Sequence, residues 1–469
     1  MSLSRRALFG AAAAATTTAF AGYARLAQAQ SAEHRSEVEG FGPLRPDPEG
    51  IFDLPDGFRY RVISQAGETM SDGFLVPHKA DGMAAFALPG GRVGLVRNHE
   101  LRPDDDNFGP LGYGRRLASR LDPALAYDVD RNGASLPGGT TTLVYDPRAG
   151  RLVSQHLSLT GTSTNCAGGE TPWGSWLTCE ETVARAGEAT RKSHGFVFEV
   201  PVGSRRLERR EPIPAMGRFR HEAVAIDPRT GVVYLTEDEG DGLFYRYLPD
   251  DRRRLHRGGR LQALGLGGST GDDTRNWNAV RWRVGERLPV VWIDVEGADN
   301  PHNDLKARMH ARGAALFARG EGIHRGADGF YFTCTSGGPA KIGQIVRYRP
   351  SPAEGQAGER DQPGAIDLFH ESADRAVIDY GDNLTVAPWG DLIVCEDKLR
   401  GTNGLKGVTP EGRVYTLGRN AMANTPGAPS NAELAGACFS PDGSTLFVNI
   451  YWPGLTLAIT GPWNRRATV

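Results

Sequence analysis

The sequence predicts an all-β protein of the β-propeller class with short accessory helices. The 469-residue chain contains 61 glycines and 30 prolines, which indicates many turns rather than long helices. Short β-like runs recur from residue 59 to residue 450, and several of the turns between them share one chemical form. A sandwich of this length would be unusual, whereas hairpins repeated over such a distance are typical of a propeller. Their spacing allows six or seven blades.

The predicted strands are short and rich in β-branched and aromatic residues. They are expected at residues 59–63, 92–97, 141–145, 151–159, 195–200, 223–226, 232–236, 243–248, 290–295, 330–334, 344–348, 391–395, 414–417 and 445–450. Helix is expected only in two short pieces, at 116–126 and 304–312.

Four turns place a proline second and a glycine last, at residues 146–150, 227–231, 409–412 and 440–443. Proline presets φ for the first central position of a turn, and glycine accepts the positive φ that closes it. Each of these turns is therefore expected to join two strands of a hairpin.

The N-terminus is typical of an export signal. Arg5 and Arg6 precede an apolar, alanine-rich run at 10–24, and residues 27–29 form a small-residue cleavage site. This pattern predicts a twin-arginine signal, with an ordinary secretory signal as the alternative. We divide the chain into a signal peptide (1–29), a loose lead-in (30–54) and a single propeller domain (55–469). The protein is then periplasmic or extracellular, and export in the folded state favours a metal site.

The net charge and the cysteine content exclude several classes of protein. The formal net charge is −2, and residues 1–29 hold three basic residues and no acidic one, so the remaining chain carries −5. This balance gives no electrostatic case for nucleic acid. No stretch after residue 29 is apolar enough to span a membrane. The five cysteines form an odd, scattered set that does not indicate a disulfide framework.

The segment 161–182 carries the clearest chemistry. Cys166 lies before a Gly/Pro turn, and Cys179, Glu180 and Glu181 follow it. A hairpin over this distance would bring the Glu181 carboxylate back to the Cys166 thiol. The alternative is a buried cysteine beside a solvated acidic turn.

Other acidic residues recur at predicted strand ends: Glu100, Glu222, Glu237, Glu321, Asp382 and Glu396. Residues 237–241 contain four carboxylates, a density of oxygen ligands that suits Ca²⁺. Each site alone is also compatible with a surface ion pair or an acidic turn. A single thiolate among carboxylates indicates a transition metal rather than Ca²⁺ alone. Arg319, two residues before Glu321, would provide a fork for a phosphate or carboxylate group.

These motifs resemble the PhoX family of bacterial alkaline phosphatases. The most specific match is the run Asn-Cys-Ala-Gly-Gly-Glu-Thr-Pro-Trp-Gly at 165–174, with Cys-Glu-Glu at 179–181. Shorter motifs support the resemblance, which covers roughly 55–455: they lie at 56–58, 70–73, 98–100, 217–222, 236–238, 319–321 and 436–443.

The resemblance implies a six-bladed propeller that hydrolyses phosphomonoesters with a cluster of Fe³⁺ and Ca²⁺ ions joined by an oxo group. It implies iron ligands at Cys166, Glu181, Glu222 and Glu321, and a phosphate contact at Arg319. The calcium ligands it implies are Glu100, Glu237, Asp238, Asp382 and Asp397. The expected partners are small phosphomonoesters, with no stable membrane insertion after signal cleavage and a monomeric protein.

Two alternatives remain open. One is a calcium-dependent propeller lactonase or phosphodiesterase, which needs carboxylates but no thiolate. The other is a non-catalytic exported propeller whose calcium only stabilises the blades. No Ser/His/Asp arrangement stands out, and of the 11 histidines only His99 and His221 lie in the motifs, where they could orient metal ligands.

Overall fold

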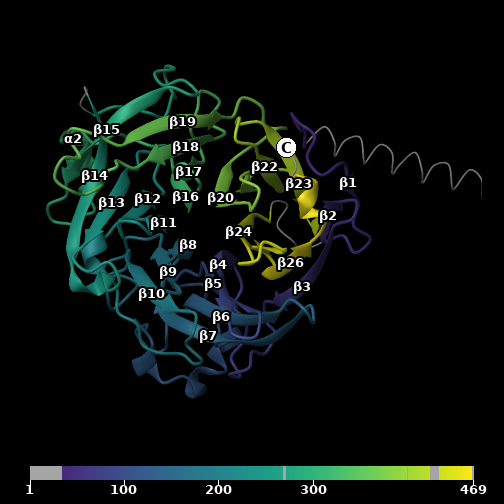
Figure 1. Ribbon diagram of the computed structural model, residues 1–469. Helices are drawn as coiled ribbons and strands as arrows, with labels where there is room; N and C mark the ends of the chain where they lie inside the picture. Colours follow the sequence, from purple (N-terminus) through teal and green to yellow (C-terminus); the bar gives the residue numbers. More distant parts are fainter. Residues whose placement is uncertain (1–33, 268–270, 399, 423–431, 467–469) are drawn as a thin grey trace, which may run out of the picture.

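The computed structural model describes residues 34–267, 271–398, 400–422 and 432–466. In these residues β-sheets surround a common centre, and helices are few and short (Figure 1). No described helix has the length and hydrophobicity that a membrane span requires. The predicted signal peptide, 1–29, lies outside the described residues.

Two small sheets are built from consecutive strands. One has the order β4-β5-β6-β7, with β4 (Ala80–Leu88), β5 (Arg92–His99), β6 (Gly138–Asp146) and β7 (Arg151–Thr162). The other has the order β8-β9-β10, with β8 (Asn165–Glu170), β9 (Ser175–Glu180) and β10 (Val197–Pro201). Both are antiparallel meanders, as in propeller blades.

A nine-stranded sheet follows. Its first five strands are β11 (His221–Ile226), β12 (Val233–Glu237), β13 (Phe244–Pro249), β14 (Gly259–Leu266) and β15 (Arg287–Asp294). Its other four are β16 (Gly320–Arg325), β17 (Phe330–Cys334), β18 (Gln344–Arg349) and β19 (Ala365–Glu371). β15 pairs with both β14 and β19, so the two meanders are joined at their outer edges.

The two remaining sheets combine both ends of the chain. One contains β20 (Gly381–Val386), β21 (Leu392–Glu396), β22 (Gly404–Val408) and β23 (Val414–Asn420), extended by β2 (Phe52–Pro55) and β1 (Leu44–Arg45). The other contains β24 (Leu434–Phe439), β25 (Thr445–Ile450), β26 (Leu455–Thr460) and β3 (Arg59–Gln65).

The prediction of a loose lead-in over 30–54 is wrong for the part that the structure describes. Phe52 pairs with Asn420 on β23, and the Glu37 amide donates to the Val414 carbonyl at 2.7 Å. The segment covers a strand edge that would otherwise present unpaired backbone groups.

Six strands lie nearest the centre: β4, β8, β11, β16, β20 and β24 (Figure 1). Each contacts the next, and β24 contacts β4, which closes the ring. Between neighbouring sheets, apolar side chains form the core; Val96 and Trp176, for example, belong to one buried cluster. The all-β, propeller-like prediction is thereby confirmed, whereas the number of blades stays a prediction.

The predicted strands and proline–glycine turns are confirmed, with boundaries that differ by a few residues. The sequence patterns missed most central strands, because these begin with glycine and polar residues, as in Gly320-Glu321-Gly322. The helix at 304–312 is confirmed as α2 (Leu305–Ala311). Residues 116–126 instead contain two 3₁₀ helices, η3 (Ala118–Arg120) and η4 (Pro123–Leu125).

The other 3₁₀ helices are single turns in loops. They are η1 (Asp106–Phe108), η2 (Tyr113–Arg115), η5 (Pro214–Met216), η6 (Leu255–Arg257) and η8 (Trp463–Arg465).

Candidate metal centre

A β-bulge recurs near the start of every central strand. Pairing with the following strand is interrupted for two residues, which frees the first of them from the ladder. The freed residues, in chain order, are Asp81, Cys166, Glu222, Glu321, Asp382 and Gly436. Five of the six carry side chains that can bind metal ions, and the repeat places them at one level of the ring.

A second set of acidic residues follows the strands that pair with the central strands. Glu100 follows β5, Glu181 follows β9, Asp238 follows β12 and Asp397 follows β21. Because these pairs are antiparallel, the end of the second strand lies beside the start of the central strand, as in the pair Asn165 and Glu180. The second set is therefore placed next to the bulge residues.

Members of the two sets, together with Glu433, form three groups, within each of which the ligand atoms lie within 4.8 Å of one another. The groups are Cys166–Glu181–Glu222, Glu222–Glu321–Asp382 and Asp81–Glu100–Glu433. Glu222 belongs to two of them. The predicted hairpin at 161–182 is confirmed, because β8 and β9 bring Cys166 and Glu181 together.

Glu222 is fully buried, and neither of its carboxylate oxygens has a hydrogen-bond partner among the described residues. Burial raises its pKa well above the ordinary value, and the nearby Asp382 and Glu181 raise it further, although a contact with the Cys166 thiol opposes this. An unpaired buried carboxylate is costly unless a cation neutralises it.

The ionisable residues around Glu222 also have raised pKa values. Burial, with the charge of Asp238, raises the pKa of Glu181 to about 8. Burial, with the charge of Asp397, raises the pKa of Asp382 to about 7. The pKa of the Cys166 thiol is raised by burial and by Asp81. So many mutually repelling groups indicate a site that a cation would stabilise.

Arg319 lies directly before β16 in a left-handed conformation, with φ of 57°. Its Nε and Nη2 donate to the two Asp238 carboxylate oxygens at 2.8 and 3.1 Å, and Nη2 also donates to Glu321 Oε1 at 2.7 Å. The neighbouring carboxylates raise its pKa. A positive φ outside glycine is uncommon and points to a position constrained by its surroundings. The predicted proximity of Arg319 and Glu321 is confirmed.

Three predicted calcium ligands are not members of the three groups that the described residues form. The Glu237 carboxylate accepts hydrogen bonds from the Leu243 amide and the Tyr245 hydroxyl, both at 3.0 Å. Successive strand residues face opposite sides, so Glu237 faces its own sheet while Asp238 faces the centre. Asp238 is occupied by Arg319. Burial raises the pKa values of Glu100 and Asp382, and the charge of Asp397 raises both further.

The sequence analysis missed Asp81 and Glu433. Asp81 is buried at the start of β4, and Glu433 directly precedes β24. Both follow the rule that an acidic residue marks the start of a central strand, which applies equally to Glu222. Their signal was hidden because these strands were not predicted.

His99 and His221 are buried and form hydrogen bonds within the protein. His99 lies 3.0 Å from the His78 carbonyl and 2.9 Å from the Thr141 hydroxyl. His221 Nε2 lies 3.0 Å from the Gly217 carbonyl. Burial lowers the pKa of His221 to about 4, so its ring is neutral at pH 7, and burial lowers the pKa of His99 well below its ordinary value. They hold the strand ends from which Glu100 and Glu222 project.

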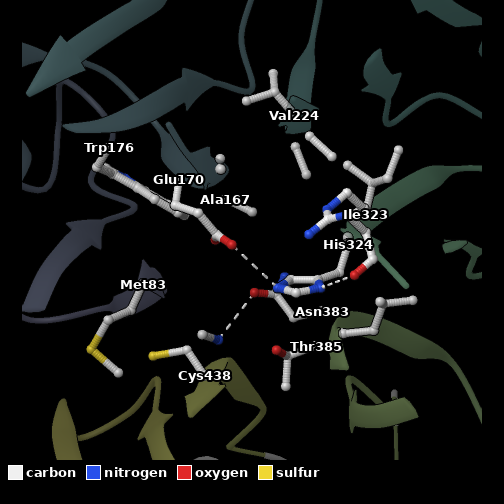
Figure 2. A pocket seen from close by; sticks show the side chains of 18 of the residues that line it. Met83, Ala167, Glu170, Trp176, Val224, Ile323, His324, Asn383, Thr385 and Cys438 are labelled. Atoms are coloured by element: carbon white, nitrogen blue, oxygen red, sulfur yellow. Dashed lines mark hydrogen bonds and ion pairs between the residues drawn. The ribbon is translucent and has the colours of Figure 1, made fainter. Parts of the chain in front are cut away.

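A cavity of about 240 Å³ lies further along the central strands (Figure 2). Met83, Trp176 and Ile323 contribute to its walls, and an ion pair of 3.6 Å joins Glu170 and His324 across it. Its lining begins at residues that directly follow the bulge residues, among them Ala167, Ala223 and Gly322, so the cavity adjoins the candidate metal centre.

The fold and the site define the class: a propeller-like protein with a buried centre of carboxylates and one thiol. Residues 39–454 match the family described as alkaline phosphatase PhoX. The chain belongs to this family and is thereby an alkaline phosphatase. The resemblance inferred from the sequence motifs is confirmed.

Comparison with one solved structure agrees on the fold. The chain is similar to Pseudomonas fluorescens PhoX in complex with vanadate, a transition state analogue, with a TM-score of 0.63 and 19% identity over 88% of this chain and 96% of that one. A gluconolactonase from Xanthomonas campestris gives a TM-score of 0.39 and 11% identity over 92% of this chain and 100% of that one. No protein with a curated description matches the chain.

Proposed function

We propose that the protein hydrolyses phosphomonoesters to release inorganic phosphate, with bound Fe³⁺ and Ca²⁺ ions, outside the cytoplasm. The observation that carries this proposal is Glu222, a buried carboxylate without a hydrogen-bond partner among the described residues, shared by two groups of ligand-type side chains. A site of one thiolate and several carboxylates fits a transition metal beside calcium.

The candidate ligands fall into two sets according to the ligand atoms that they offer. Cys166, Glu181, Glu222 and Glu321 would hold iron, because the thiolate is a soft ligand and the carboxylates balance a trivalent charge. Asp81, Glu100, Glu433 and Asp382 offer only oxygens, which suits calcium. Asp397 adds negative charge beside them. Glu237 and Asp238, occupied by other partners, would support rather than bind the ions.

The bound ions would supply positive charge that offsets the charge of the phosphoryl group during hydrolysis. The Arg319 guanidinium would bind the phosphoryl group through Nη1, since Nε and Nη2 donate to Asp238 and Glu321, and would stabilise the charge that develops on its oxygens. Asp238 holds that guanidinium through two hydrogen bonds, so its orientation is set before substrate arrives. In the reaction, the P–O ester bond is cleaved and water provides the hydroxyl on phosphorus and the proton on the alcohol.

The number of blades is part of the proposal because each blade contributes one central strand to the ring that carries the candidate ligands. We infer six blades, with the nine-stranded sheet counted as two that share β15. The six bulges support this count, one at the start of each central strand.

Elemental analysis of natively exported protein, with a colorimetric phosphomonoesterase assay, tests the function. We expect iron and calcium together, with activity lost on chelation and in Cys166→Ala and Glu181→Ala variants. Retained activity in either variant would contradict the proposed centre. Calcium without iron and without phosphatase activity would favour a lactonase, a phosphodiesterase or a non-catalytic propeller.

Export is tested separately. Replacing Arg5 and Arg6 by lysines should keep the protein in the cytoplasm if the twin-arginine route is used. Unchanged export of this variant would indicate an ordinary secretory signal.

A further inference from the structure

Arg220 lies directly before β11, as Arg319 lies directly before β16. Each arginine lies two residues before the bulge residue of its strand, Glu222 and Glu321 respectively. Each also contacts the acidic residue that ends a strand of the preceding meander. Arg220 Nη1 donates to Glu181 Oε1 at 3.3 Å, whereas Arg319 binds Asp238. The propeller repeat therefore presents two equivalent guanidinium groups.

The two arginines flank the two ligand groups that share Glu222. Arg220 contacts Glu181 of the Cys166 group, and Arg319 contacts Glu321 of the Asp382 group. Both guanidinium groups are therefore close to the region where a phosphoryl group would bind.

The side chain of Arg220 is not fully used in hydrogen bonds that stabilise the fold. It is 43% exposed, and its Nε lies 3.1 Å from Glu239 Oε1 in an ion pair without hydrogen-bond alignment. Arg218 provides the contrast within the same segment. It is buried, and it donates to the carbonyls of His194 at 2.8 Å and Asn300 at 2.9 Å. Arg218 therefore connects loops through these hydrogen bonds, whereas Arg220 has N–H groups that are available to bind a ligand at the site.

We propose that Arg220 is a second phosphate-binding residue, which grips the phosphoryl group together with Arg319 and favours phosphomonoesters over phosphodiesters. A monoester phosphoryl group has three unesterified oxygens and up to two negative charges, whereas a diester has two oxygens and one charge. Two guanidinium forks match the monoester, because each can engage a pair of oxygens or one oxygen and its neighbouring carboxylate. This inference rests on the proposed function of the same site.

The test compares Arg220→Gln and Arg220→Lys in the metal-loaded enzyme. A matched control is Lys306→Gln, which removes a nearby cation whose partners are Glu239 and Asp241. The measurements are calorimetric binding of inorganic phosphate, metal content, and kcat/KM for a monoester and a diester of the same alcohol.

We expect Arg220→Gln to weaken phosphate binding by about tenfold or more, since a charged hydrogen bond contributes about 1.5–3 kcal/mol. Monoester kcat/KM should fall more than diester kcat/KM. Arg220→Lys should recover part of the binding, because it keeps the charge but not the fork. Lys306→Gln should bind phosphate like the wild type, and metal content should be unchanged throughout.

Three results would overturn the inference: wild-type phosphate affinity in Arg220→Gln, an equal fall for monoester and diester, or loss of metal in that variant. Metal loss would assign Arg220 to holding Glu181 instead. The proposed function fails on its own if the metal-loaded wild type binds phosphate through Arg220 yet hydrolyses no monoester. The inference fails on its own if the wild type is active and Arg220→Gln matches it.

Discussion

Glu180 and Glu181 are consecutive, yet their carboxylates belong to different networks. Glu180 is fully buried and accepts hydrogen bonds from the Ser163 amide at 3.0 Å and the Gly195 amide at 2.9 Å. Glu181 faces the centre and joins Cys166 and Glu222. The alternation of strand side chains separates a structural carboxylate from a ligand.

Glu180→Gln should therefore reduce stability, and Glu181→Gln should reduce metal content. Glu180 is part of a buried charged network, and breaking such a pair costs about 3–5 kcal/mol. Removing Glu181 relieves repulsion, so the metal-free Glu181 variant should be at least as stable as metal-free wild type. Thermal unfolding and elemental analysis of both variants check this pair. A Glu181 variant with full metal content would contradict the site.

Cys166→Ser should lose transition metal and keep calcium, because serine replaces the only thiol in the three ligand groups that the described chain forms. Cys179→Ser is the matched control, since Cys179 is buried in an apolar cluster on β9. The control should be less stable by about 1–3 kcal/mol, the cost of burying a hydroxyl, with its metal content unchanged. Equal iron in Cys166→Ser and wild type would show that the thiol is not a ligand.

Gly436→Ala should disturb both the fold and the Asp81 group. Gly436 has φ of 60°, and a Cβ there would lie 2.4 Å from the Asp81 carbonyl oxygen. Gly90→Ala is the control, with φ of 78° and no heavy atom within 4 Å of its Cβ. The control should lose about 1 kcal/mol from backbone conformation alone. Gly436→Ala should lose clearly more, together with calcium. Equal unfolding free energies for the two variants would contradict the close approach.

Removing metal should make stability fall as pH rises. In the folded, metal-free protein the pKa of Glu181 is raised to about 8, against an ordinary value of 4.5. The folded state then binds more protons than the unfolded state, so stability is lost between pH 4.5 and 8 and levels off above that range. Chelated protein should show a steeper decline in thermal unfolding over this range than metal-loaded protein does. Chelated protein that is equally stable at pH 5 and pH 8 would contradict the raised pKa.

His194 should add a second loss of stability at higher pH. It lies 2.6 Å from Glu180 and 3.2 Å from Asp128, and despite burial these carboxylates raise its pKa to about 9. A histidine with a raised pKa stabilises the fold fully below pH 6.5, and this contribution is lost as pH rises through 9. The contribution is about 3 kcal/mol, because a difference of one in pKa corresponds to about 1.4 kcal/mol.

His194→Gln tests this assignment in metal-loaded protein, where the ligand carboxylates do not titrate. The variant should be less stable at pH 6 and approach the wild type near pH 10. A difference that stays constant over this range would show that His194 contributes through packing alone.

The sequence by itself determined the outer architecture and one half of the site. Proline–glycine turns such as 227–231 specify hairpins through local dihedral preferences, so strands on either side were predictable. The hairpin of β8 and β9 is also local, which is why Cys166 and Glu181 could be placed together before any tertiary information. The family motif at 165–174 rests on the same segment.

Only the tertiary structure decided which distant acidic residues meet. Glu222, Glu321 and Asp382 come together because the ring closes and repeats one bulge on each central strand, a relationship that no local pattern encodes. Strand register decided that Asp238 rather than Glu237 faces the centre, since a shift of one residue reverses every side chain. The central strands β4, which carries Asp81, and β24, which Glu433 directly precedes, escaped prediction because glycine and charge near their starts serve the site rather than strand propensity.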